Sequence, residues 1–213
     1  MNKKTLIKLI IGLIVIIIFI YGFSGGQPTE EYIEMINEER EDQDIFMRNS
    51  SDSPFYENFK NYNGLTFYPI DAKYKIKARF VPIRKKAIRK LPTNDDLERE
   101  YLEYGYAEFT FSDKDQKLLI LEDVTEDELF LAFGDETSAI ETYGAGRYLD
   151  ITHSGGNTIT LDFNFSFNPY CAYSDAFSCP LPPRENLLSV AIEAGEKTYQ
   201  YTQITRAFKQ QND

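Results

Sequence analysis

The sequence predicts a mostly β protein, with a single antiparallel β-sandwich or small barrel domain preceded by an N-terminal transmembrane helix and an amphipathic helix. One observation is an uncharged, largely apolar run between Lys8 and Glu30. Another is the spacing of apolar residues, which follows a helical period before residue 48 and a period of two further on. Because no repeating helices separate the period-two runs, an antiparallel arrangement is favoured. The expected regions are a membrane segment, a helical neck and one β-rich domain, at 1–26, 27–48 and 49–213.

Residues 6–23 are the part of the chain expected to contact the membrane. As a helix that rises about 1.5 Å per residue, this run nearly spans a hydrocarbon core. The basic residues near it are all at its N-terminal end, at Lys3, Lys4 and Lys8. This asymmetry favours an uncleaved single-pass anchor in the cell membrane, with the C-terminal domain extracytoplasmic. Ser24-Gly25-Gly26 also fits a cleavage site, so a signal peptide and secretion to the periplasm are the alternative.

The helical neck is expected to contain one amphipathic helix over residues 30–47. Thr29 can cap it, and Glu30 and Glu31 in the first turn interact favourably with the positive end of the helix dipole. The Asn- and Ser-rich stretch that ends at Pro54 breaks the helical pattern.

The clearest strand is residues 74–80, where basic and apolar residues alternate. Further strands are expected at 65–68, 106–111, 118–121, 129–133, 146–151, 158–163, 188–192 and 199–204. Residues 94–101 are expected to form a short helix or an acidic loop. The basic cluster over residues 84–90 favours a solvated strand edge or hairpin over a headgroup-binding patch.

Composition and motifs exclude several classes of function. The 213 residues carry a net charge of −11, which argues against nucleic-acid binding. Two cysteines and one histidine make a zinc site unsupported, and neither a metal nor a cofactor is expected. The chain has no Gly-x-Ser-x-Gly elbow, His-Glu-x-x-His motif or phosphate loop. His153 is interpreted as an exposed turn residue. Paired carboxylates for glycan hydrolysis stay open, because 34 acidic residues allow many combinations.

Four motifs stand out in the second half of the chain, and they are Thr142-Tyr-Gly-Ala-Gly-Arg-Tyr-Leu-Asp-Ile151, Asn168-Pro-Tyr-Cys-Ala-Tyr173, Cys179-Pro-Leu-Pro-Pro-Arg-Glu-Asn186 and Ile192-Glu-Ala-Gly-Glu196. With these motifs the chain resembles a bacterial family catalogued as domain of unknown function 1684. The resemblance covers about residues 40–200. It implies a bacterial envelope protein, and it implies no activity, ligand or catalytic residue.

The strand at 158–163 and the proline-rich connection 168–186 are the candidate site. One face of that strand is polar, and it is either solvent surface or the lining of a concave site. The candidate ligand-binding residues are Arg147, Asp162, Asn164, Asn168, Glu185 and Asn186. Arg147 shares its strand face with Leu149 and Ile151, so we expect it to be buried and paired with Asp162 or Glu185. A structural clasp is favoured over a ligand-binding arginine.

Cys171 and Cys179 lie within the same connection. A disulfide is favoured for an extracytoplasmic domain, while free buried thiols, metal binding and redox chemistry stay open. A non-catalytic ligand-binding or interaction module is the leading hypothesis for function. A structural, partner-binding module of the envelope and a carboxylate-dependent hydrolase are the alternatives. The ligand or protein partner is unknown at this stage.

Overall fold

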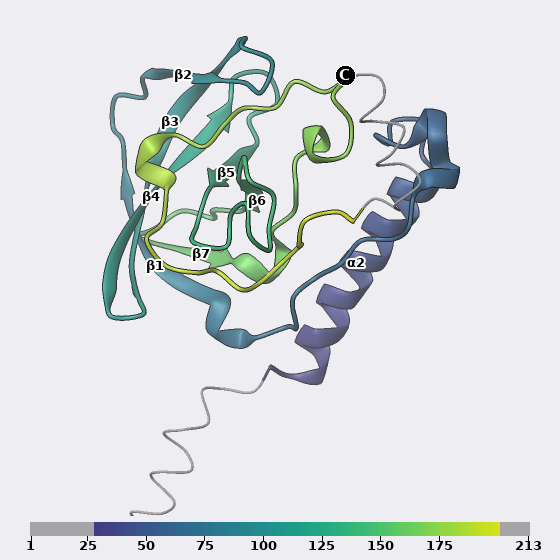
Figure 1. Ribbon diagram of the computed structural model, residues 1–213. Coiled ribbons are helices and arrows are strands. Elements are labelled where there is room, and N and C mark those ends of the chain that lie inside the picture. Colours follow the sequence, from purple (N-terminus) through teal and green to yellow (C-terminus); the bar gives the residue numbers. More distant parts are fainter. Residues whose placement is uncertain (1–27, 201–213) are drawn as a thin grey trace, which may run out of the picture.

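The computed structural model describes residues 28–200 (Figure 1). It contains one seven-stranded antiparallel sheet with the strand order β6-β5-β4-β3-β1-β7, and β2 pairs with β3 off this path. The strands are β1 Lys75–Pro82, β2 Ile88–Pro92, β3 Glu98–Phe111, β4 Lys114–Asp123, β5 Leu129–Phe133, β6 Arg147–Ile151 and β7 Thr158–Asp162. The two ends of the order, β6 and β7, also touch. The predicted mostly β antiparallel class is confirmed, in the form of a half-barrel made from a single curled sheet.

The helix α2 spans Glu30–Asn49 and lies beside the half-barrel (Figure 1). The Thr29 side chain accepts a hydrogen bond from the Tyr32 amide at 3.2 Å, which confirms the predicted cap. Ile36 and Met47 are buried against the domain. The predicted membrane segment at 6–23 lies outside the described residues. Within residues 28–200, no helix is both long enough and apolar enough to cross a bilayer.

Short 3-10 helices fill the connections. They are η1 Tyr56–Asn61, η2 Ala72–Tyr74, η3 Phe163–Phe165, η4 Tyr170–Ala172 and η5 Arg184–Asn186. Three of them, η3, η4 and η5, follow β7, so the chain there runs over the domain without pairing as a regular strand.

The core fills the concave side of the sheet. Alternate residues of the strands point inward, as the period of two predicts, and examples are Ala78, Phe80 and Leu161. The irregular segment after η5 lies across this core with its apolar side chains buried, and these are Leu188, Val190, Ile192 and Ala194. This segment closes the half-barrel in place of a further strand.

The longest strand, β3, explains one wrong prediction. The helix expected over 94–101 is wrong, and the alternative, an acidic loop, is correct only for residues 94–97, which form a turn before β3 begins at Glu98. β3 pairs with β2 along its first half and with β1 along its second half, and a bulge lies between Glu103 and Gly105. A Cβ on Gly105 would lie 2.5 Å from the Phe80 ring, so the bend requires glycine.

The basic cluster occupies the β1–β2 connection and β2, which confirms the edge interpretation. β2 pairs only with β3 among the described strands. Its basic residues pair with acids on neighbouring elements: Arg89 with Glu103 and Glu185, and Lys90 with Glu98 and Glu100.

Two other predicted strands do not form. Residues 188–192 have no regular strand structure, and residues 65–68 contribute only an isolated bridge between Phe67 and Glu196. The strand predicted at 199–204 lies mostly outside the described residues, and residues 199–200 are not in a strand.

Candidate functional site

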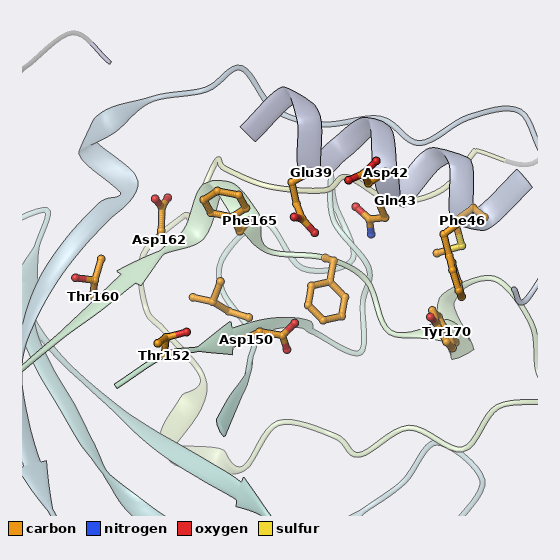
Figure 2. A pocket seen from close by; sticks show the side chains of 13 residues that line it. Glu39, Asp42, Gln43, Phe46, Asp150, Thr152, Thr160, Asp162, Phe165 and Tyr170 are labelled. Atoms are coloured by element: carbon orange, nitrogen blue, oxygen red, sulfur yellow. The ribbon is translucent and has the colours of Figure 1, made fainter. Parts of the chain in front are cut away.

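A cavity of about 700 Å³ lies between α2 and the edge of the half-barrel formed by β6 and β7 (Figure 2). α2 contributes Glu39, Gln43 and Phe46, which the helical repeat places on one side of the helix. From the opposite side, the ends of β6 and β7 contribute Asp150 and Asp162. The cavity therefore depends on the packing of the neck helix against the β domain.

Three of the four carboxylates in the cavity have no cationic partner. The Asp162 carboxylate accepts hydrogen bonds from the Tyr32 hydroxyl at 2.8 Å and from Asn164, and the Lys75 ammonium lies 3.6 Å away. The side chains of Glu39, Asp42 and Asp150 are exposed and make no hydrogen bond or ion pair with any described residue. No lysine or arginine lines the cavity within the described part of the chain.

The electrostatic field of the cavity acts on Asp150. Partial burial raises the pKa of this carboxyl above its ordinary value, and the nearby charges of Glu128 and Glu39 raise it further. Burial alone would disfavour a charge of either sign, but the contribution of Glu128 and Glu39 reflects a negative potential, which would attract a cation.

Aromatic side chains form the other part of the lining. Phe46 of α2 stacks on Tyr170 of η4 with their ring centroids 6.1 Å apart and an interplanar angle of 12°. Phe165 and Phe167 add two more rings. Thr160 and Asp162, on the polar face of β7, also line the cavity. Of the two alternatives for this face, solvent surface or the lining of a concave site, the second is therefore correct.

Asn164 positions the β7 end of the cavity without facing into it. Its side chain is 1% exposed and donates hydrogen bonds to the Tyr32 hydroxyl, the Asp71 carbonyl and the Asp162 carboxylate. It also accepts a hydrogen bond from the Asp71 amide at 3.0 Å. Asn164 therefore holds α2 and β7 together. The sequence analysis predicted a ligand-binding residue here, whereas the structure shows a structural one.

Arg147 is buried as predicted, with an exposed fraction of 1%, but its predicted partners are wrong. Its Nη2 atom lies 2.9 Å from Oδ2 of Asp135, which follows β5. The guanidinium also donates to the backbone carbonyls of Ile192, Ala194 and Glu196. It lies away from the cavity.

The three other polar candidates also lie outside the cavity. Asn186 is fully buried, and its amide bonds to the backbone of Leu119 and Ala132 where β4 and β5 separate. The Asn168 amide donates to the Lys197 carbonyl at 2.9 Å. Glu185 forms a partly exposed ion pair with Arg89. Of the six candidates, Asp162 alone lines the cavity.

A family model of proteins of unknown function, DUF1684, matches residues 60–197. The chain belongs to the DUF1684 family. The solution NMR structure of an uncharacterised protein from Haloarcula marismortui resembles it at a TM-score of 0.64 and 32% sequence identity, covering 79% of this chain and 95% of that chain. No curated protein matches the chain. The family predicted from the motifs is thus confirmed, and the bacterial origin stays a prediction.

This DUF1684 domain contains a fully buried carboxylate, Glu196, that the sequence reasoning missed. It accepts hydrogen bonds from the backbone N–H of Asn168 at 2.9 Å and from the Tyr173 hydroxyl. Burial raises the pKa of Glu196 to about 7, although these donors oppose the shift. Its place in the Ile192–Glu196 family motif was the signal available in the sequence.

The cysteines of the DUF1684 domain are adjacent and buried, and both are free thiols in the structure. The Cys171 amide donates a hydrogen bond to Cys179 Sγ at 3.2 Å. The predicted proximity is therefore correct, but the predicted bond is not formed here. Within residues 28–200, no cluster of three or more His, Cys, Asp or Glu residues could hold a metal ion. His153 is only partly exposed, and its ring packs 4.2 Å from that of Phe80, so its interpretation as an exposed turn residue is wrong.

Proposed function

We propose that this protein is a non-catalytic binding module whose ligand is a small organic cation with an apolar part, held in the cavity between α2, β6 and β7. The observation that carries the proposal is the lining: Glu39, Asp42 and Asp150 lack partners among the described residues, and aromatic rings stand beside them. The volume, about 700 Å³, is in the range of small-molecule sites.

The chemistry of the lining selects the sign and the shape of the ligand. Unpaired carboxylates repel one another, and an ammonium group placed between them would remove that repulsion. Aromatic faces add an attraction for the same cation, and they also cover apolar groups attached to it. An anionic ligand would meet uncompensated negative charge.

We also propose that residues 6–23 anchor the protein in the cell membrane and that the binding domain is extracytoplasmic. Support comes from the uncharged run and from the lysines that precede it. In that arrangement the cavity would bind ligands present outside the cytoplasmic membrane.

The binding proposal can be tested with three probes of one shape and different charge. They are phenethylamine, neutral 2-phenylethanol and anionic phenylacetate, titrated calorimetrically into the full-length protein in a mild detergent. We expect phenethylamine to bind at least about tenfold more tightly than the alcohol, a difference of about 1.4 kcal/mol, and phenylacetate not to bind.

Variants locate the site. Asp150→Asn and Glu39→Gln should each weaken phenethylamine binding by about tenfold, since each removes an interaction with a charged partner. Glu31→Gln is the matched control, because Glu31 is an exposed acid of the same helix and does not line the cavity. Equal binding of the amine and the alcohol, or an equal effect of the control, would reject the proposal.

A further inference from the structure

A second reactive element lies in the connection after β7, and it consists of the two thiols. Cys171 belongs to η4, and Cys179 lies eight residues further along. Each residue is 7% exposed. The Cys171 amide donates to Cys179 Sγ at 3.2 Å. The sulfur of one cysteine therefore accepts a hydrogen bond from the backbone of the other.

This arrangement makes the two thiols unequal. The neighbouring Cys171 side chain is the largest cause that lowers the pKa of Cys179, to about 7, while burial opposes the shift. The Cys171 amide and the charge of Arg99 also lower that pKa, and Asp95 raises it. The pKa of Cys171 is raised by the same pairing and by burial. Cys179 is thus the thiol of the pair that loses its proton first.

The surrounding structure holds Cys179 in place. Its amide donates to Asn94 Oδ1 at 2.6 Å, and its carbonyl accepts from the Asn94 amide at 3.2 Å. Asn94 belongs to the turn between β2 and β3. On the other side, the Tyr143 hydroxyl donates to Cys171 Sγ at 3.8 Å. The two cysteines are therefore each held by an element outside their own connection.

We propose that Cys179 and Cys171 form a hydroperoxide-sensitive dithiol, with Cys179 as the nucleophile and Cys171 as the resolving thiol. The Cys179 thiolate attacks one oxygen of the hydroperoxide, the O–O bond breaks, and hydroxide or alkoxide leaves. The resulting sulfenic acid is attacked by the Cys171 sulfur. An S–S bond forms, the S–O bond breaks, and the Cys171 proton leaves with the hydroxyl group as water. Two thiols are oxidised by two electrons and one hydroperoxide is reduced.

The low exposure of both residues selects the oxidant. A hydroperoxide with little attached to it can reach a sulfur in a residue that is 7% exposed, whereas a bulky disulfide requires an open path to form its mixed intermediate. The resolving step requires little movement, because the Cys171 amide already contacts Cys179 Sγ. Oxidation would tie η4, whose Tyr170 stacks on Phe46, to the segment held by Asn94.

The experiment uses the full-length protein in mild detergent, reduced with dithiothreitol, freed of it, and exposed to hydrogen peroxide near pH 7. We expect wild type to lose both alkylatable thiols and to consume one peroxide per chain. The Cys171→Ser variant should accumulate a sulfenic acid on Cys179 that dimedone traps. The Cys179→Ser variant should react at least about tenfold more slowly, because its remaining thiol is not activated.

Two further measurements keep the test independent of the variants' folding. Wild type unfolded in urea should lose its rate advantage over Cys179→Ser, since the activating contacts are gone. An equal rate for folded and unfolded wild type would overturn the proposal, as would dimedone labelling of Cys171 in Cys179→Ser at the wild-type rate. A bridge that dithiothreitol cannot open in the folded protein would identify a permanent structural disulfide and would overturn it as well.

Discussion

Arg147 and Asp135 form an ion pair inside the half-barrel, with 2.9 Å between Nη2 and Oδ2 and about 1% of each side chain exposed. The remaining hydrogen bonds of the guanidinium go to the carbonyls of Ile192, Ala194 and Glu196. Asp135 accepts in turn from the amides of Thr137 and Ile192. The pair therefore supplies hydrogen bonds that a neighbouring strand would otherwise supply to the segment after η5.

Asp135→Ala should lower the free energy of unfolding by roughly 3–5 kcal/mol, because it leaves the Arg147 charge buried without its counterion. Denaturant unfolding followed by circular dichroism measures the effect. Arg48→Ala, which removes the exposed pair with Asp44, is the control and should have a far smaller effect. A small loss for Asp135→Ala would mean that the backbone carbonyls alone neutralise Arg147.

Glu196 should make stability fall as the pH rises toward neutral. Its pKa is raised from 4.5 in the unfolded chain to about 7 in the folded protein, so the folded state favours the protonated form. The stabilising contribution is complete below pH 4.5 and is lost as the pH rises through about 7. The size of the shift corresponds to about 3 kcal/mol.

Glu196→Gln isolates this contribution, because the amide keeps the shape of the protonated acid and does not ionise. The difference in unfolding free energy between wild type and Glu196→Gln should shift in favour of the variant between pH 4.5 and 7.5. Denaturant titrations at several pH values measure it, and other titrating groups cancel in the difference. A difference independent of pH would show that Glu196 has an ordinary pKa.

Binding of an organic cation should weaken as the pH falls toward the acidic range. The pKa of Asp150 is raised by burial and by Glu128 and Glu39, so this carboxyl takes up a proton above its ordinary value of 3.8 and loses its attraction for a cation. Phenethylamine titrations from neutral to acidic pH should show the loss in wild type. Asp150→Asn should bind more weakly at neutral pH and should show a flatter dependence.

The membrane anchor predicts that full-length protein stays in the membrane fraction after extraction with alkaline carbonate. Val15→Arg combined with Ile16→Arg places two charges in the middle of the run and should release the protein, because charge at the bilayer centre is costly. Fractionation followed by immunoblotting measures both. Release of the unaltered full-length chain would reject the anchor, and a shortened mature chain would indicate a cleaved signal peptide.

Local patterns in the sequence predicted most of the regular elements. The cap at Thr29 and the helical period placed α2, and alternation placed the inward side chains of β1 and β7. Such features depend on neighbours only a few residues away, so the amino-acid sequence alone is enough to predict them. The burial of Arg147 followed from the same alternation.

Pairings between distant residues could not be obtained in this way. Asp135 and Arg147 lie on successive strands or just beyond them, and alternation does not state which acid a buried arginine meets. The segment 188–194 has the composition of a strand, yet Arg147 and Asp135 take up part of its hydrogen-bonding capacity. Asn186 likewise bonds to the backbone of Leu119 in β4 and of Ala132 in β5, at a place where the two strands diverge. The sequence gives no sign of that divergence.

The cavity shows the same division most clearly. The sequence by itself determined that Thr160 and Asp162 share a polar strand face and that Glu39 lies on an acidic helix, because both follow from short-range periodicity. Only the tertiary structure decided that these two surfaces face each other across about 700 Å³ with three carboxylates lacking partners among the described residues. The physical reason is that the docking of α2 on β6 and β7 is set by contacts between residues more than a hundred positions apart, such as Tyr32 with Asp162 and Asn164.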